Sequence, residues 1–291
     1  MTFPAEFVPL FIAIVLAVAV TTVHRRLPPV LAARAVLITM VVVLGAALPT
    51  LWIASLGYLA DAPVIGSRFR WCAEALGGHH PIPAAVGIVA TMASVAGILR
   101  LLRVVRVHRR LRRDETGSVE IATDDQPFAF TLPGRGGHVI VSTGLIDMLD
   151  APERDVVFAH EQAHARHRHD RYLLTAKLAS SALPFLRPLA SRLKFSLERW
   201  ADEVAAESCG DRRLVAQTLA KVAMKQLPAA GMLGFNGLGV PGRVAALLAP
   251  PVSSPARVSL AGLWVAIGAT GALAAFQIHH LVLLLTALCP G

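Results

Sequence analysis

The 291-residue sequence contains few cysteines, few aromatic residues and few acidic residues, and these shortages exclude several kinds of site. None of the three cysteines, Cys72, Cys209 and Cys289, belongs to a CxxC pair, so a cysteine-ligated metal site is disfavoured. Aromatic residues make up 6% of the chain, and none lies within the arginine-rich stretch 100–113. Because bases of single-stranded nucleic acid stack on aromatic side chains beside basic ones, direct binding of nucleic acid is also disfavoured.

Hydrophobic residues are abundant instead, at 55% of the chain, with a mean hydropathy of +0.58. This is too apolar for an ordinary soluble domain and predicts several membrane spans. The apolar runs of suitable length lie at residues 7–23, 35–56, 82–99 and 258–277. The first run could also be a signal peptide, but basic residues follow it rather than precede it. We therefore expect a mainly α-helical integral membrane protein with four transmembrane helices.

The distribution of positive charge predicts how the chain is oriented in the cell membrane. The net charge is +9, and the arginines of residues 100–113 directly follow the third apolar run. Arginine-rich flanks stay in the cytoplasm, and Arg25, Arg26 and Arg34 after the first run agree. The prediction is a multi-pass protein with both termini outside and residues 100–256 inside. The same arginines could also bind anionic lipid of the bilayer.

A disulfide bond is one consequence of this orientation. Cys72 and Cys289 would both lie outside the cell, where thiols oxidise, so we predict a bond between them. The alternative is that both cysteines stay unpaired.

The stretch that carries chemistry is VVFAHEQAHARHRHD, which contains an HExxH motif at His160, Glu161 and His164. On a helix, positions i and i+4 lie on one face, so both imidazoles can reach one metal ion. Zinc suits imidazole and carboxylate ligands and keeps one position open in a catalytic site. Glu161 is rotated by about 100° from His160, which places it to act as a base toward a water that attacks a peptide carbonyl.

A third ligand is available downstream in LERWADEVA, at residues 197–205. Glu198 can complete a His-His-Glu site for one zinc ion per chain, and Asp202, one turn later, can accept the outward N–H of a ligand histidine. His167 and His169 follow the HExxH motif. We interpret them as solvated or as hydrogen-bonding partners of the ligands, because two ligands already come from this helix.

The remaining features predict an α+β domain inserted between the third and fourth transmembrane helices. Residues 128–130 and 138–142 read as a β-hairpin, whose edge either binds extended substrate by strand addition or is purely structural. Residues 172–190 are interrupted by prolines and charges, which suits an interfacial helix or a re-entrant element. Residues 212–226 read as an amphipathic helix. The expected division is 1–113 for the first three spans, 114–255 for the domain, and 256–291 for the fourth span and a short outer tail.

Taken together, the motifs resemble the BlaR/MecR-type membrane-embedded zinc metallopeptidases, which are bacterial beta-lactam sensor-transducers, and their shorter relatives. The resemblance covers nearly the whole chain and is carried by FAFTLPG…GHVIVSTGLIDML, VVFAHEQAHARHRHD, ALPFLRPLASRL with LERWADE, and GRVAALL. HExxH with ExxxD is shared with the HtpX and CAAX-prenyl-protease group, so the predicted topology decides between them. The resemblance implies a gluzincin with zinc ligands His160, His164 and Glu198, catalytic Glu161, and supporting Asp202.

One departure from that family limits what the resemblance implies. The transducers carry an extracellular penicillin-binding domain after the last span, and this sequence has none, so beta-lactam sensing is not expected. The resemblance implies a regulated cytoplasmic endopeptidase that cleaves a winged-helix transcriptional repressor or itself in signal transduction.

Two other functions stay open from the sequence. One is an HtpX-like protease for quality control of membrane proteins, which shares the chemistry. The other is a non-catalytic membrane receptor or scaffold with structural zinc, which an intact Glu161 disfavours because such a site needs no base. The substrate, the activating signal and the oligomeric state are not predicted.

Overall fold

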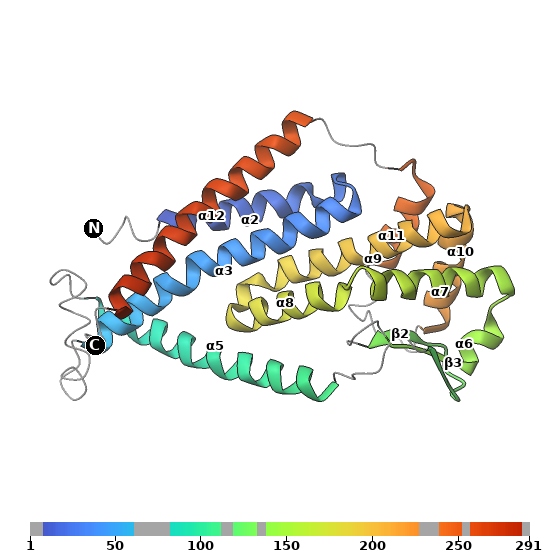
Figure 1. Ribbon diagram of the computed structural model, residues 1–291, viewed down its shortest axis with the longest axis horizontal. Helices are drawn as coiled ribbons and strands as arrows, with labels where there is room; N and C mark the ends of the chain where they lie inside the picture. Colours follow the sequence, from blue (N-terminus) through green and yellow to red (C-terminus); the bar gives the residue numbers. More distant parts are fainter. Residues whose placement is uncertain are drawn as a thin grey trace.

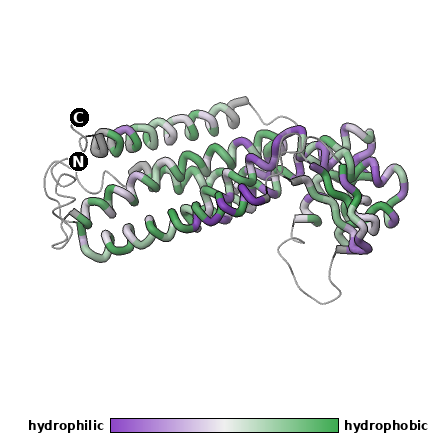
Figure 2. Tube along the Cα trace, turned by 60° about the horizontal axis from the view of Figure 1, so that its bottom comes forward, coloured by the Kyte–Doolittle hydropathy of each residue, from purple (hydrophilic) through white to green (hydrophobic). Residues whose placement is uncertain are grey.

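The computed structural model describes residues 8–60, 82–111, 119–132, 138–226, 239–251 and 257–286. Long apolar helices form a bundle, and a lobe with a small sheet and shorter helices adjoins one end of it (Figure 1). The bundle helices are α2 (Val8–Val23), α3 (Pro29–Ala60), α5 (Ala84–Leu111) and α12 (Arg257–Thr286). Hydrophobic residues dominate the bundle, whereas hydrophilic residues gather on the lobe and at the end of the bundle beside it (Figure 2).

Two helices of the bundle are long and apolar enough to cross a membrane, within Pro29–Leu59 and Ala84–Arg110. They point to a membrane association and correspond to the second and third predicted spans. A shorter apolar stretch, Ala261–Phe276, lies in α12. For the first and fourth spans, the transmembrane assignment stays a prediction. The most apolar part of α3 is 56% buried, against 17% for α5, so α3 is the central helix and α5 exposes its apolar side chains.

The segment 172–190, predicted as an interfacial helix or a re-entrant element, folds as a helical hairpin rather than as one continuous helix, and its placement in a membrane stays a prediction. Helix α8 (His169–Ala182) is followed by a 3-10 turn, η2 (Pro184–Leu186), and by α9 (Arg187–Cys209). The prolines explain the break, because proline is tolerated in the first turn of a helix but not in its interior. Helix α8 contacts both α3 and α5, and a Cβ added at Gly97 of α5 would lie 3.2 Å from the Ala182 carbonyl oxygen. Buried leucines of α9 also join the core of the bundle, whereas the rest of the lobe packs around two hydrophobic clusters of its own.

The predicted β-hairpin is confirmed, and a third strand extends it. Strands β2 (Ala129–Leu132) and β3 (His138–Ser142) are antiparallel, and β1 (Val119–Ala122) pairs with β3 in parallel. Among the strands that the structure describes, the order is β1-β3-β2, so β2 has a free edge. Helix α6 (Thr143–Met148) follows β3 directly. The central strand β3 is mostly buried, whereas Phe130 of β2 is exposed.

Helix α7 (Ala151–Arg166) carries the HExxH motif and starts with a reciprocal cap. The Asp150 carboxylate accepts a hydrogen bond from the Glu153 N–H at 2.9 Å, and the Glu153 carboxylate accepts one from the Asp150 N–H at 3.0 Å. This arrangement satisfies donors that the first turn of a helix leaves free. Glu153 also places negative charge in the first turn, where it is favourable to the helix dipole.

The lobe is completed by helices α10 (Arg212–Gln226), as predicted, and α11 (Val240–Leu248). Arg212 pairs with Glu203 of α9 and donates to the carbonyl oxygens of Leu247 and Ala246, each at 3.0 Å. These bonds hold the end of α11 against α9.

Of the three cysteines, the structure describes only Cys209, which is not part of the predicted disulfide bond. Cys209, at the end of α9, has a free thiol. Cys72 and Cys289 lie outside the described residues, so the bond between them stays a prediction.

Candidate metal centre

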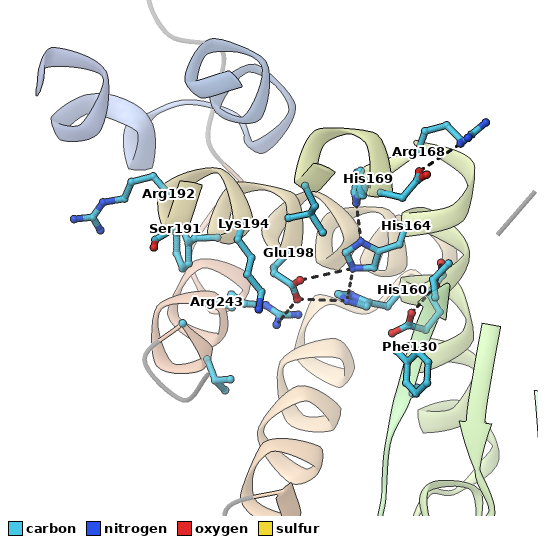
Figure 3. Close-up of a pocket in the computed structure, with 18 of the residues that line it drawn as sticks. Phe130, His160, His164, Arg168, His169, Ser191, Arg192, Lys194, Glu198 and Arg243 are labelled. Carbon is cyan, nitrogen blue, oxygen red and sulfur yellow. Dashed lines mark hydrogen bonds and ion pairs between the residues drawn. The ribbon is translucent and has the colours of Figure 1, made fainter. Parts of the chain in front are cut away.

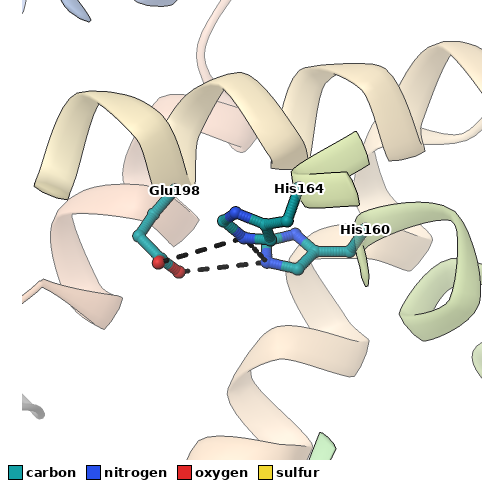
Figure 4. A group of neighbouring side chains, drawn as sticks. All are labelled: His160, His164 and Glu198. Atoms are coloured by element: carbon teal, nitrogen blue, oxygen red, sulfur yellow. Dashed lines mark hydrogen bonds and ion pairs between the residues drawn. The ribbon is translucent and has the colours of Figure 1, made fainter. Parts of the chain in front are cut away.

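Helices α7 and α9 bring the three predicted ligands together, with His160 and His164 on α7 and Glu198 on α9 (Figure 4). One ligand atom from each lies within 4.8 Å of the other two. The two Nε2 atoms are 3.1 Å apart, and the Glu198 carboxylate oxygens lie 3.9 Å from His160 Nε2 and 4.0 Å from His164 Nε2. Zinc binds such atoms at about 2.0–2.2 Å, so donors about 3–4 Å apart can share one ion.

The outward nitrogens of both histidines have partners, as metal ligands require. His160 Nδ1 lies 3.1 Å from Asp202 Oδ1, and His164 Nδ1 lies 2.8 Å from His169 Nδ1 (Figure 3). A histidine that binds metal through Nε2 carries its proton on Nδ1 and donates it. With zinc on both Nε2 atoms, Asp202 and His169 would be the acceptors, and His169 would carry its own proton on Nε2.

A histidine that binds zinc must be neutral. The pKa shift of His164 favours the neutral form, whereas that of His160 favours the protonated form. Burial lowers the pKa of His164 to about 3 and the pKa of His169 to about 3, so both are neutral at pH 7. Burial also acts to lower the pKa of His160, but the hydrogen bond and charge of Asp202 outweigh it, and that pKa is raised. A metal at His160 therefore competes with a proton, since a ligand imidazole must be neutral. The donor set, its spacing and its outward partners fit zinc.

His169 reaches His164 because the chain breaks between them. Helix α7 ends at Arg166, and Arg168 takes a left-handed conformation with φ 55° before α8 begins at His169. On one continuous helix, positions 164 and 169 would point about 140° apart. The His169 ring is buried at 1% exposure and packs 4.8 Å from the ring of Trp200. The solvated interpretation is therefore wrong for His169, and the alternative, a partner of a ligand, agrees with its contact to His164.

Arg243 of α11 forms ion pairs with both Glu198 and Asp202. The sequence did not predict it as a residue of the site. Its Nε and Nη2 donate to the two Asp202 oxygens at 2.7 and 2.6 Å, and Nη1 lies 2.9 Å from Glu198 Oε2. Burial acts to raise the pKa of Asp202, but the bonds from Arg243 and His160 hold it well below its usual range. A bidentate pair of this kind also fixes orientation. The sequence feature that could have indicated its role is that Arg243 is the single charged residue of the otherwise apolar stretch GRVAALL.

The predicted base, Glu161, lies beside the free edge of the sheet. Thr131 of β2 donates its hydroxyl to Glu161 Oε2 at 2.7 Å, a contact that the sequence did not predict. Burial raises the pKa of Glu161, and the charge of Glu198 adds to the effect. A carboxylate with a raised pKa accepts a proton more readily near neutral pH, as a general base must.

A cavity of about 1160 Å³ contains the candidate ligands and the base. It is lined by β2 at residues 129–131, by α7, by the first half of α9, by α11, and by Arg25 of η1 (His24–Arg26) between α2 and α3. The free edge of β2 and the candidate ligands therefore open onto the same space (Figure 3).

Comparison with known proteins identifies the same region. The family model of peptidase family M48 matches residues 99–197, which contain the HExxH motif and end one residue before Glu198. No curated protein and no solved structure matches the chain. The match supports a gluzincin-type metallopeptidase, of a family that is zinc-dependent in general. It does not separate the BlaR/MecR type from other gluzincins.

Proposed function

We propose that this protein is a membrane-embedded zinc endopeptidase that cleaves a cytoplasmic or membrane-proximal protein. The observation that carries the proposal is the convergence of His160, His164 and Glu198, with both outward imidazole nitrogens partnered and Glu161 in the same cavity. A purely structural zinc site has no use for a buried base beside an open cavity of this size.

Each residue of the site has a defined part in peptide hydrolysis. Zinc held by the three ligands would supply Lewis-acid activation of water and of the scissile carbonyl. Glu161 removes the proton from the attacking water and returns it to the leaving amine. Thr131 orients the Glu161 carboxylate, and Arg243 orients Glu198. The free edge of β2 binds the substrate as an added strand, since its Ala129 and Phe130 line the cavity.

The test is a comparison of zinc content and peptide cleavage in the purified full-length protein. Glu161→Ala should retain one zinc per chain and lose cleavage, whereas His160→Ala and Glu198→Ala should lose zinc as well. Retained cleavage in Glu161→Ala would refute the assigned base. Unchanged zinc in either ligand variant would remove that residue from the metal centre.

We further propose a role in signal transduction, with the lobe on the cytoplasmic side and a winged-helix repressor or the protein itself as substrate. The arginines of α5 and η1, which lie at the lobe end of the apolar helices, support this orientation. Proteome-wide comparison of N-terminal peptides between host cells with the wild type and with Glu161→Ala tests it. One or a few cleaved cytoplasmic proteins would support signalling, and many accumulating membrane proteins would support quality control. No difference under any stress would favour a non-catalytic receptor.

A further inference from the structure

Helix α9 carries a row of polar side chains that runs from the hairpin turn to the candidate metal ligand. Arg187, Ser191, Lys194 and Glu198 follow one another at intervals of four, three and four residues, so they share one face of the helix. All of them line the cavity. Figure 3 shows Ser191, Lys194 and Glu198 in sequence along α9, with Arg192 beside them.

The basic members of this surface have no acidic partners among the residues that the structure describes. Two other cations of the cavity are already used, since Arg243 binds carboxylates of the metal centre and Arg168 pairs with Asp170 at 3.4 Å. The cations that remain are Arg25, Arg187, Arg192 and Lys194, which we call the basic wall. All four are exposed.

The basic wall is positioned by the fold of the bundle and the hairpin. The Arg25 guanidinium lies over the Phe195 ring, 5.3 Å from its centroid, so the turn between α2 and α3 adds its charge to α9. Like charges on one side of a cavity focus their field into it and attract an oppositely charged ligand.

We propose that the basic wall binds acidic side chains of the polypeptide substrate close to the bond that is cleaved. This inference rests on the proposed function. Helical rise places Lys194 about 6 Å and Arg187 about 16 Å along α9 from Glu198. An extended peptide advances about 3.3 Å per residue. The acidic residues therefore lie about two to five positions from the scissile bond.

A peptide fits the basic wall better than a lipid headgroup does. The wall shares its cavity with the candidate ligands and with Phe130 and Thr131 of the edge strand, so a chain lying along that strand faces it. Arginines suited to a bilayer surface occur on α5, from Arg100 onward, and none of those in the described part of α5 lines this cavity.

The experiment measures peptide binding by the full-length Glu161→Ala protein in detergent micelles, so that cleavage does not interfere. Two fluorescent peptides of equal length differ only in two aspartates placed two to five positions from the central bond. At low salt the acidic peptide should bind about tenfold more tightly, and the preference should shrink at high salt. The double variant Arg187→Gln and Lys194→Gln should reduce the preference for the acidic peptide to about twofold. The double variant Arg187→Glu and Lys194→Glu should reverse the preference, so that a lysine-containing peptide binds more tightly.

A matched control is Arg213→Gln, which removes an exposed arginine of α10 that does not line the cavity and should keep the full preference. Zinc content and thermal unfolding show that each variant is folded. Equal binding of the two peptides would overturn the proposal. So would wall variants that keep the preference but lose binding to phosphatidylglycerol vesicles, because the ligand would then be lipid.

The failure of this inference is distinguishable from the failure of the proposed function. If the zinc-loaded wild type cleaves neutral and acidic peptides with equal kcat/KM, the peptidase stands and the basic wall proposal falls. If it cleaves no peptide while Glu161→Ala still binds the acidic one selectively, the wall stands and the peptidase proposal falls.

Discussion

The basic residues in the first half of α9 and the two carboxylates Glu198 and Asp202 further along the helix differ in how they are used. In the second half, Glu198 and Asp202 lie in ion pairs with Arg243 and contact the histidines of α7. In the first half, Arg187, Arg192 and Lys194 are exposed and form no ion pair within the described parts of the chain. A charge with internal partners stabilises one arrangement of the protein, whereas an exposed charge without a partner is available to a ligand. The contrast separates the residues of the candidate metal centre from those that we propose to bind the substrate.

The largest effect is expected from Arg243→Leu, which breaks the ion pairs of Glu198 and Asp202. It would leave the Asp202 carboxylate, 2% exposed, without its bidentate partner. Removing one member of a buried ion pair costs about 3–5 kcal/mol. Thermal unfolding in detergent should show a clearly lowered midpoint, together with reduced zinc content. A midpoint within error of the wild type would mean that Arg243 contributes nothing to the centre.

Asp202→Asn should weaken zinc binding and also destabilise the fold, because it removes the other charged member of the buried pair with Arg243. The amide can no longer accept the His160 Nδ1–H as a charged partner, and changes behind a ligand histidine typically cost 10–100-fold in metal affinity. Competition with a chelator of known affinity measures the effect. Asp155→Asn, at an exposed position of the same helix as the histidines, is the control and should bind zinc like the wild type.

His169→Phe tests whether the hydrogen bond between His169 and His164 supports zinc binding. Phenylalanine keeps the packing against Trp200 but cannot accept the His164 Nδ1–H, so zinc affinity should fall by about tenfold. His167→Phe is matched to it, because His167 also stacks on Trp200 at 4.7 Å but makes no hydrogen bond to either ligand histidine. If His169→Phe binds zinc as tightly as His167→Phe and the wild type do, the contact between His169 and His164 has no part in zinc binding.

The smallest effect is expected from Arg192→Gln, among the basic residues in the first half of α9. Substitution of an exposed side chain away from caps and ion pairs changes stability by no more than about 0.5 kcal/mol. Unfolding midpoint and zinc content should therefore match the wild type. A large destabilisation would show that the basic wall is part of the folding core and would erase the difference between the two groups of residues.

Local rules predicted the elements of the site well. The HExxH spacing placed His160 and His164 on one helical face, and residues 138–142 were predicted as a strand of a hairpin. At residues 172–190 the prolines predicted an interrupted segment, and the structure has the break there, but the antiparallel return of α9 along α8 was not predicted. Periodicity shows that a helix ends but not which way the chain turns next.

The sequence by itself predicted that His160 and His164 share one helical face with Glu161 beside them, because helical geometry relates residues three or four positions apart without reference to the rest of the chain. Tertiary structure alone decided what surrounds them. Arg243 and Asp202 are 41 residues apart, Thr131 and Glu161 are 30 apart, and the contact of His169 with His164 depends on a left-handed residue between two helices. Such contacts form because tertiary packing brings the polar faces of α7, α9, α11 and β2 together, and no local pattern encodes that distance.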